Sequence, residues 1–407
     1  MISVDDALKT ILAGVPVLGT EKVHIIDTLG RVIAEDVISG RNIPPFDNSA
    51  MDGYALKAAD TTGASPEKPA TLKVVADLPA GYTLDRELQA GEAVRIMTGA
   101  PVPPGADSVV RVEDTEKRGE TVRILVQVKS GKDTRRKGED VKVGDVVIEK
   151  GTRITPAAVG MMSSVGRSMV QVYQRPRVAV LATGDEVVDV DQEAGPGKIY
   201  NSNGYTIASQ VREAGGLPVM LGIAKDTRED LEAKLKAGLT CDVIISSGGV
   251  SVGDFDFVKD VLSSLGSEMK FWKVGMRPGK PLAFGVIGGK PAFGLPGNPV
   301  SSMVTFEQFV RPALRKMMGY AALQRPTVNA VLEDDVKKEP SLRFFVRGVV
   351  SRVDGKYRVS TTGPQGSGIL RSMVIANGLI VLPEGTEGAK AGDTVRVQLF
   401  NREFEEE

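Results

Sequence analysis

Short apolar runs alternate with amphipathic stretches in the middle of the chain, between residues 175 and 325. The pattern predicts strands at 177–182, 217–223 and 242–246, separated by helices at 204–214, 226–238 and 255–265. Ser202 or Asn203 is expected to cap the first of these helices. Apolar strands divided by helices predict a mostly parallel sheet with right-handed crossovers, in which ligands bind beyond the carboxyl ends of the strands.

The regions on either side of this α/β segment contain short apolar runs divided by Gly and Pro turns, which predict small all-β domains. Before it we expect a short helix ending near Gly14, strands at 72–75, 93–97, 108–112 and 122–128, a β-like stretch at 142–153 and a helix at 156–165. After it, runs at 328–332, 343–352, 356–360, 378–382 and 394–399 predict a compact barrel or sandwich. The predicted fold class is therefore multidomain, α/β plus all-β.

The chain has 407 residues, which predicts two to four domains, and 42% of them are hydrophobic. No window approaches eighteen consecutive apolar residues, and the N-terminal sequence has no basic start followed by an apolar core. We therefore expect no membrane span and no signal peptide, with the cytoplasm as the compartment. The net charge of −1 and the aromatic content of 5% argue against nonspecific nucleic-acid binding.

The sequence contains one cysteine, Cys241, and one histidine, His24. An intrachain disulfide and a Cys/His zinc site are therefore excluded. Both residues lie in apolar runs, so we expect Cys241 in the core and His24 as a partly buried structural residue. Any catalysis must rest on carboxylates, Lys and Arg, hydroxyls, backbone amides or a metal with oxygen ligands.

A glycine-rich segment follows the third predicted strand and opens the next helix: Ser246-Ser247-Gly248-Gly249-Val250-Ser251-Val252-Gly253-Asp254-Phe255-Asp256. Its glycines allow backbone amides to approach an anion, and Ser247 and Ser251 can donate hydrogen bonds to phosphate. Asp254 and Asp256 would repel a bare phosphate, so they indicate either a bridging cation or helix capping. A tight glycine turn with an Asp cap explains the segment equally well when it is considered alone.

The other two strand ends carry polar loops, Thr183-Gly184-Asp185-Glu186 and Lys225-Asp226-Thr227. Each alone is typical of a capped helix start or a solvated turn. Because parallel strands end at the same edge of a sheet, Glu186, Asp226 and Asp256 are expected to lie together there. Clustered carboxylates repel one another, and a hard cation such as Mg²⁺ relieves that repulsion. The sequence therefore predicts a Mg²⁺ site formed by these three acids.

Two further turns combine prolines with polar residues. Arg277-Pro278-Gly279-Lys280-Pro281 projects two fixed cations, which suit an oxyanion such as phosphate, molybdate or sulfate. An ordinary charged turn is the simpler interpretation of this segment alone. In Leu295-Pro296-Gly297-Asn298-Pro299-Val300-Ser301, Asn298 is a good N-cap and Pro299 fits the first helical position. Pro312 is expected to kink or break the helix that follows.

Residues 44–55, PPFDNSAMDGYA, are unusually rich in acids, Gly and small polar residues for a linker. Together with RIMTGAPVPPGAD, RRKGED, VAVLATGDEV, SSGGVSVGDFD, RPGKP and LPGNPVSS, in this order, the segment resembles the molybdopterin molybdenumtransferase family. That family includes MoeA and the E-domain of gephyrin and of its plant counterpart. The resemblance covers residue 1 to about residue 400.

The resemblance implies an elongated homodimer with composite active sites and four domains in each subunit. Residues 1–45 and 141–174 would form a connecting domain, 46–140 a small β-domain, 175–325 the molybdopterin-binding α/β domain, and 326–407 a C-terminal β-barrel. The implied reaction is Mg²⁺-dependent hydrolysis of adenylylated molybdopterin, with transfer of molybdate or tungstate to the dithiolene and release of AMP. One alternative is a molybdopterin adenylyltransferase, which needs only the α/β domain. If the chain is the transferase, that enzyme is an expected partner. The other alternative is a non-catalytic, gephyrin-like scaffold.

The resemblance also assigns roles to individual residues. It gives catalytic roles to Asp52, Thr98, Asp140, Glu186, Asp226 and Asp256. It gives ligand-binding roles to Arg277, Lys280, Pro296, Pro299, Arg347 and Ser367. These residues join the ligand-binding candidates of the loops described above, which are Thr183, Gly184, Ser247, Gly248, Gly249, Ser251 and Asn298. Family members often carry Lys where this chain has Arg277. The positive charge is kept, but the planar guanidinium of arginine replaces the compact ammonium of lysine. Segment 363–373 departs most from the family pattern.

Overall fold

The computed structural model describes residues 1–248, 261 and 265–400 of the chain. These residues belong to two compact units, a larger unit of Met1–Glu21 with Gln171–Glu407, and a smaller unit of Lys22–Val170. The helix expected at 255–265 lies almost wholly outside the described residues.

The larger unit is built on a six-stranded sheet with the order β16-β13-β17-β21-β20-β18. Its strands are β13 (Arg177–Thr183), β16 (Leu217–Ala224), β17 (Val243–Ser247), β18 (Glu268–Lys273), β20 (Pro281–Ile287) and β21 (Lys290–Leu295). Strands β16, β13, β17 and β21 run parallel, whereas β20 and β18 join by antiparallel pairing. The expected mostly parallel sheet is confirmed, and each of the three predicted strands extends one residue further at its carboxyl end.

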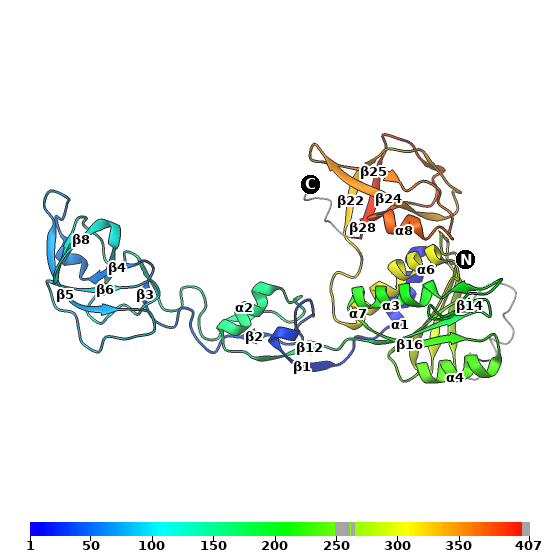
Figure 1. Cartoon of the computed structure of the whole chain (residues 1–407), viewed down its shortest axis with the longest axis horizontal. Helices are drawn as coiled ribbons and strands as arrows, with labels where there is room; N and C mark the ends of the chain where they lie inside the picture. The colour runs from blue at the N-terminus through cyan, green and yellow to red at the C-terminus, as the bar shows by residue number, and fades with distance from the viewer. Residues whose placement is uncertain (249–260, 262–264, 401–407) are drawn as a thin grey trace. The chain divides into compact units, whose positions relative to one another are not determined.

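Alternating side chains of the parallel strands support helices on both faces of this sheet. Val178 and Val180 belong to a core with α1, α3, α6 and α7, whereas Ala179 and Leu181 belong to a core with α4. The helices are α1 (Val4–Gly14), α3 (Ser202–Ala214), α4 (Arg228–Gly238), α6 (Pro299–Thr305) and α7 (Arg311–Met317). Figure 1 shows α4 on the opposite side of the sheet from α3 and α7.

Helix α1 groups with the larger unit, although the sequence resemblance placed residues 1–45 together in a connecting domain. Ser3 caps the helix, and Val4, Ala7 and Ile11 are buried in the core that α7 also enters. An apolar face at this spacing needs a partner, and the helices of the α/β domain provide it. The other domain limits expected from the sequence stay predictions.

Two helix boundaries refine the expectations from the sequence. Helix α3 is capped by Asn201 rather than by Ser202 or Asn203, because the Asn201 side chain accepts a hydrogen bond from a first-turn amide. The expected break near Pro312 is present as a π-helical turn, η4 (Phe306–Val310), between α6 and α7. Pro312 itself lies in the first turn of α7, directly after this π-helical turn.

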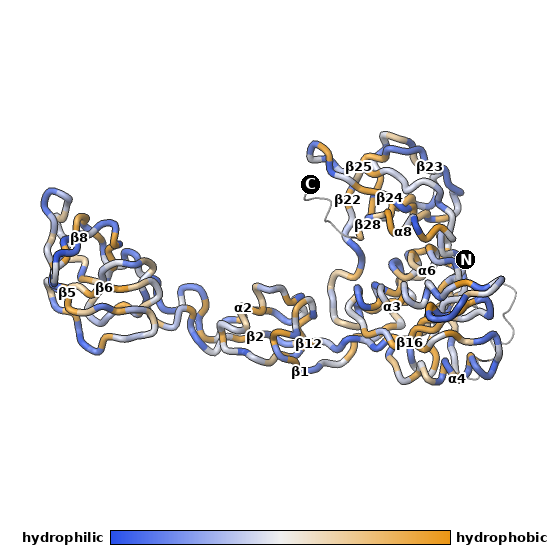
Figure 2. Tube along the Cα trace, in the orientation of Figure 1, coloured by the Kyte–Doolittle hydropathy of each residue, from blue (hydrophilic) through white to orange (hydrophobic). Residues whose placement is uncertain are grey.

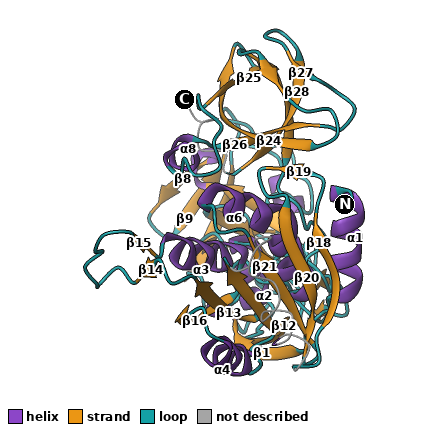
Figure 3. Cartoon of the chain, turned by 90° about the vertical axis from the view of Figure 1, so that its right-hand side faces the viewer, coloured by secondary structure: helices purple, strands orange, loops and turns teal. Residues whose placement is uncertain are grey.

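The C-terminal strands close into a five-stranded barrel, which Figure 3 shows above the α/β sheet. Its strands are β22 (Thr327–Leu332), β24 (Arg343–Val353), β25 (Lys356–Thr361), β26 (Gly378–Leu382) and β28 (Thr394–Leu399). The barrel closes because β26 pairs with β24 as well as with β28. Short β19 (Met276–Arg277) adds to β24 in parallel, so the RPGKP turn starts at the barrel. Helix α8 (Arg371–Ile375) and the pair β23 (Val336–Lys337) and β27 (Gly388–Ala389) complete this part.

The smaller unit contains a six-stranded sheet with the order β7-β4-β6-β5-β9-β8. The strands are β4 (Gly53–Leu56), β5 (Ala70–Leu78), β6 (Glu92–Ile96), β7 (Ser108–Arg111), β8 (Thr115–Arg118) and β9 (Thr121–Ile124). Tyr54 and Leu56 face one apolar cluster and Ala55 faces another, so both faces of β4 are buried. Figure 2 shows hydrophobic stretches (orange) alternating with hydrophilic loops (blue) in both units.

The remaining elements are short. They are η1 (Ile25–Asp27), η2 (Ala58–Thr61), η3 (Val112–Asp114), α2 (Pro156–Ser164) and the paired strands β1 (Thr20–His24) with β12 (Met169–Tyr173), β2 (Val37–Ile38) with β11 (Val146–Ile148), β3 (Asn48–Ser49) with β10 (Thr134–Arg135) and β14 (Val187–Val188) with β15 (Ile199–Tyr200). Cys241 is buried as expected, but His24 is exposed and caps η1. Within the described ranges, no helix combines the length and apolar character that crossing a membrane requires.

Candidate active site

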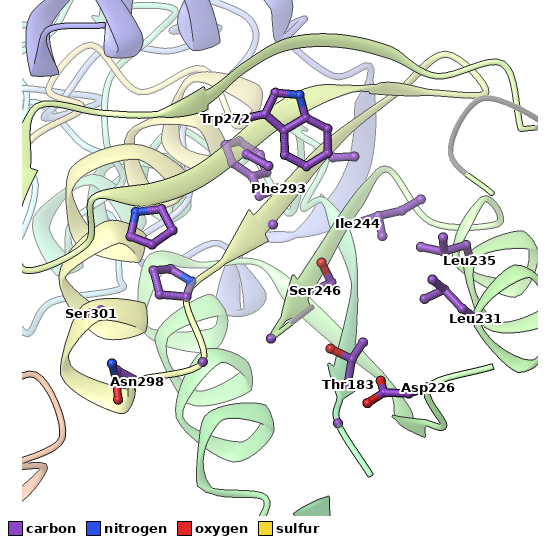
Figure 4. Close-up of a pocket in the computed structure, with 18 of the residues that line it drawn as sticks. Thr183, Asp226, Leu231, Leu235, Ile244, Ser246, Trp272, Phe293, Asn298 and Ser301 are labelled. Atoms are coloured by element: carbon purple, nitrogen blue, oxygen red, sulfur yellow. The ribbon is translucent and has the colours of Figure 1, made fainter. Parts of the chain in front are cut away.

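The carboxyl ends of the four parallel strands lie along one edge of the sheet. Thr183 pairs with Ala224, and Ser247 pairs with both Ala182 and Leu295. The loops that follow these strands therefore meet at this edge, as expected for an open parallel sheet. They bring together the predicted residues Thr183, Gly184, Glu186, Asp226, Ser247, Gly248, Pro296 and Asn298, several of which Figure 4 shows.

Two glycines allow these loops to approach one another closely. Gly184 and Gly248 have φ angles of 130° and 92°, which side-chain-bearing residues rarely adopt. A Cβ on Gly248 would lie 2.7 Å from the carbonyl oxygen of Thr183, and a Cβ on Gly184 would lie 2.6 Å from the Glu186 carboxylate. Glycine is therefore required at position 248 by both backbone conformation and space.

The two acidic loops are joined by reciprocal hydrogen bonds. The Asp185 amide donates to Oδ2 of Asp226 (3.3 Å), and the Asp226 amide donates to Oδ1 of Asp185 (3.1 Å). Lys198 donates from Nζ to the carbonyl of Asp185 (2.6 Å). Glu186 and Asp226 are both exposed at this edge. Asp185 is an additional acid here, which the sequence motifs contained but did not single out.

The third acid of the expected Mg²⁺ site, Asp256, lies outside the described residues, as do Gly249 and Ser251. Among the residues that the structure describes, no three His, Cys, Asp or Glu side chains are grouped so that they could hold a metal ion. The metal site of Glu186, Asp226 and Asp256 therefore stays a prediction. The acids that do reach this edge offer carboxylate oxygens, the ligand type that a hard cation prefers.

Asn203, in the first turn of α3, links two of the loops. Its side-chain amide donates to Oγ of Ser247 (2.8 Å) and to the carbonyl of Gly297 (2.7 Å). Ser247 is 3% exposed, so the bond fixes a buried hydroxyl at the end of β17. Sequence reasoning considered Asn203 only as a helix cap, because nothing local signals contacts with residues 44 and 94 positions away.

A cavity of about 520 Å³ opens beside these loops. The polar side chains of Thr183, Asp226, Ser246 and Asn298 lie toward one end, and apolar side chains lie toward the other, among them Ile244, Leu231, Leu235, Phe293 and Trp272 (Figure 4). Ile244, Leu231, Leu235 and Phe293 are at most 6% exposed and belong to the hydrophobic cores, so the polar end is the part that can contact a ligand.

The loop before α6 connects this edge to the barrel. Asn298 and Pro299 occupy the expected N-cap and first helical positions, but the Asn298 side chain makes no capping hydrogen bond and lines the cavity. The carbonyl of Ser367, in a barrel loop, instead accepts a hydrogen bond from the Val300 amide (3.1 Å). Ser367 therefore lies at the start of α6, and its carbonyl is occupied by this hydrogen bond.

A second cavity of about 520 Å³ lies between the RPGKP turn and the barrel, and we call it the cationic cavity. Its charged lining residues are four cations and one acid: Arg277, Lys337, Lys338, Arg347 and Glu339. The guanidinium of Arg277 lies over the ring of Phe344, 5.5 Å from its centroid. Lys280 belongs to the same turn and is exposed. The cavity therefore has a strong excess of positive charge.

Arg347 is the most deeply buried of these cations, with 1% of its surface exposed. Its Nε donates to Oγ of Ser372 and its Nη2 donates to the carbonyl of Gly366, both at 3.1 Å. Burial lowers the pKa of the Arg347 guanidinium to about 10, and no acid among the described residues opposes this shift. A buried cation that lacks an acidic partner is stabilised when an anion binds beside it.

Asp52 and Thr98 form a close pair in the smaller unit. Oδ1 of Asp52 accepts hydrogen bonds from the amide and the hydroxyl of Thr98, both at 2.7 Å. Both hydrogen bonds hold the pKa of the Asp52 carboxyl below its usual range, and the bond from the Thr98 amide has the larger effect. Asp140 belongs to another loop of this unit, where its amide donates to the carbonyl of Ile43 (3.0 Å). No hydrogen bond among the described residues joins Asp140 to the Asp52–Thr98 pair.

Three family profiles match the chain in sequence order. The MoeA N-terminal region (domain I and II) matches residues 2–166, a probable molybdopterin binding domain matches residues 179–316, and the MoeA C-terminal region (domain IV) matches residues 329–400. The three matches together span nearly the whole chain.

Full-length relatives give the same result. The chain is 39% identical to the molybdopterin molybdenumtransferase of Nostoc sp., with 98% of this chain and 93% of that protein covered. It is 37% identical to the protein of the same name from Bacillus subtilis, with 99% and 95% covered. A crystal structure of the molybdopterin biosynthesis moeA protein from Pyrococcus horikoshii OT3 superposes with a TM-score of 0.84 at 31% identity, covering 98% of this chain and all of that one.

Proposed function

The chain belongs to the molybdopterin molybdenumtransferase family and is a transferase of molybdenum cofactor biosynthesis, and we propose that it acts on adenylylated molybdopterin. In the proposed reaction, water cleaves the phosphoanhydride to release AMP, and molybdate or tungstate is transferred to the dithiolene. Mg²⁺ is the proposed cofactor.

The observation that carries this proposal is the cationic cavity. Arg347 is buried there without an acidic partner in the described ranges, and Arg277 adds a second guanidinium beside the Phe344 ring. Planar guanidinium groups donate paired hydrogen bonds to oxyanions, and a dianion such as molybdate would offset their charge. We assign molybdate binding to Arg277 and Arg347, with Lys280 and Ser367 beside them.

The sheet edge supports cleavage of the adenylylated substrate. The hydroxyls of Thr183 and Ser246 line the cavity there and can donate hydrogen bonds to phosphate oxygens. The Gly248 amide is bound to the Leu295 carbonyl and the Ser247 hydroxyl is buried, so these two shape the edge. Glu186 and Asp226 supply carboxylate oxygens for Mg²⁺, which when bound would offset negative charge on the phosphoanhydride.

We also propose that the enzyme is a homodimer with composite sites. Asp52, Thr98 and Asp140 would then act from the smaller unit of one subunit on the sheet edge of the partner. The ionised, exposed carboxylate of Asp52, fixed by two hydrogen bonds from Thr98, suits such a role.

A reconstituted reaction tests the proposal. Purified protein is incubated with adenylylated molybdopterin and Mg²⁺, with and without molybdate or tungstate, and AMP and metal-loaded cofactor are measured. We expect AMP and loaded cofactor only when Mg²⁺ and the oxyanion are both present. Adenylylation of molybdopterin with ATP would identify an adenylyltransferase instead. Absence of molybdate-dependent AMP release, together with a tightly bound peptide, would favour a scaffold.

A further inference from the structure

We propose that Lys338 is a further anion-binding residue of the cationic cavity, and that Phe344 positions it together with Arg277. This inference rests on the proposed function, because it adds residues to the oxyanion site of that reaction. Neither Lys338 nor Phe344 belongs to the sequence motifs that indicated the site.

Phe344 connects the two sides of the cavity. It lies on β24 directly opposite Arg277 of β19, and it is 9% exposed. The Arg277 guanidinium and the Lys338 ammonium each lie 5.5 Å from the centroid of its ring. Because a ring face attracts cations, one aromatic side chain holds a cation from the α/β domain and another from the barrel.

Lys338 is buried, with 8% of its surface exposed, which is unusual for a lysine. Its Nζ donates to the carbonyls of Leu342 (2.9 Å) and Glu339 (3.1 Å), so one of its three donors has no partner among the described residues. No carboxylate of the described chain lies within ion-pair distance of it. Burial lowers the pKa of its ammonium, and the more distant carboxylates of Glu384 and Glu339 oppose this shift only in part. Such a charge is costly to bury unless an anion offsets it.

The cavity offers that compensation, since Lys338 and Arg347 both line it and neither forms an ion pair with a carboxylate in the part of the chain described. Arg277 completes the group from the opposite side. Three fixed cations around one space suit a tetrahedral dianion better than a singly charged ligand. Lys338 would therefore contribute directly to molybdate affinity, and Phe344 would contribute by holding Lys338 and Arg277 in place.

Binding of sodium molybdate to the full-length protein, measured by isothermal titration calorimetry, tests this inference. Lys338→Met and Phe344→Leu should each weaken binding about tenfold, which corresponds to about 1.4 kcal/mol. The double variant should bind little worse than Phe344→Leu alone, because loss of the ring already removes the contact that holds Lys338 in place. Lys356→Met, which removes an exposed lysine of β25 in the same barrel, should bind within about twofold of the parent.

Thermal unfolding of the same variants separates binding from folding. If Lys338→Met melts at a lower temperature but binds molybdate normally, Lys338 only stabilises its loop through hydrogen bonds to the carbonyls of Glu339 and Leu342. In that case the inference is wrong. Arg347→Met distinguishes this outcome from failure of the proposed function. Loss of binding in Arg347→Met but not in Lys338→Met would overturn the role of Lys338 alone. Normal binding in both variants would overturn the oxyanion site itself.

Discussion

The side-chain amide of Asn203 donates a hydrogen bond to the hydroxyl of Ser247, 2.8 Å away, and so joins the start of α3 to the end of β17. The same amide reaches the carbonyl of Gly297 at 2.7 Å, in the loop that leads into α6. One side chain therefore holds together two of the loops that border the larger unit's sheet-edge cavity.

Replacing Asn203 by Ala should loosen both loops at once. We expect the free energy of unfolding to fall by about 1–2 kcal/mol, because two hydrogen bonds are lost and a buried hydroxyl loses its donor. The KM for adenylylated molybdopterin should rise. Urea unfolding and steady-state kinetics measure the two effects, with Asn329→Ala, at an exposed position of β22, as the control. Equal stability and KM in the two variants would show that the Asn203 contacts are unimportant.

Gly248→Ala tests the close approach of the loops after β13 and β17. The matched control is Gly289→Ala, because Gly289 has a φ of 79° but a Cβ there would meet no atom within 4 Å. Gly289→Ala should lower the free energy of unfolding by about 1 kcal/mol, because alanine must adopt a left-handed backbone conformation there. Gly248→Ala should cost clearly more and abolish AMP release, since its Cβ would lie 2.7 Å from the Thr183 carbonyl. Similar unfolding energies for the two variants would mean that the loops can separate freely.

The sheet edge could be predicted because its causes are local in the sequence. Apolar runs end near Thr183, Ala224 and Ser247, and parallel strands that end together bring their loops together. The glycines and acids of these loops can therefore be identified from the sequence alone. The strands of the barrel also follow from local patterns, but its closure does not, because those patterns did not distinguish a barrel from a sandwich and the closing β24–β26 pair joins distant segments.

The interactions that could not be predicted join distant parts of the chain. Asn203 contacts Gly297 across 94 positions, and the Phe344 ring meets Arg277 because β19 adds to β24. Neither contact leaves a periodic pattern or a recognisable spacing. Lys338 resembles an ordinary surface lysine in the sequence, and only its burial distinguishes it.

The Asp5–Arg343 ion pair should make stability depend on pH. Arg343 of β24 donates to both carboxylate oxygens of Asp5 (2.7 and 2.8 Å), and this bonding holds the Asp5 pKa below its ordinary value of 3.8. A carboxyl with a depressed folded-state pKa stabilises the protein above its unfolded pKa and loses that effect as pH falls through the folded pKa.

Asp5→Asn should therefore be less stable than the parent at neutral pH, and the difference should shrink below about pH 4. The Asp5 side chain is 75% exposed, so the difference should not exceed about 1 kcal/mol. Urea unfolding of both proteins from neutral to acidic pH measures it. A difference that grows on acidification would contradict the assigned direction of the pKa shift.

Lys280→Ala tests the cationic turn. Losing one charge-assisted hydrogen bond to the oxyanion should weaken molybdate use by roughly 1.5–3 kcal/mol, while the fold survives because Lys280 is exposed. The molybdate concentration that gives half-maximal loaded cofactor measures the effect. Lys273→Ala, at an exposed position of β18, should leave it unchanged. An unaltered molybdate dependence in Lys280→Ala would mean that RPGKP is only a turn.

Mixing two inactive proteins tests the composite site. In a heterodimer of Asp52→Ala and Asp226→Ala subunits, one composite site would contain both substitutions and the other would contain neither. Random exchange makes about half of the dimers heterodimers, each with one intact site, so about a quarter of the parental AMP release should return. If each site were instead built from a single chain, every site would lack one acid and no activity would return. Native mass spectrometry establishes the exchange, and absent recovery after complete exchange would rule out a site shared between subunits.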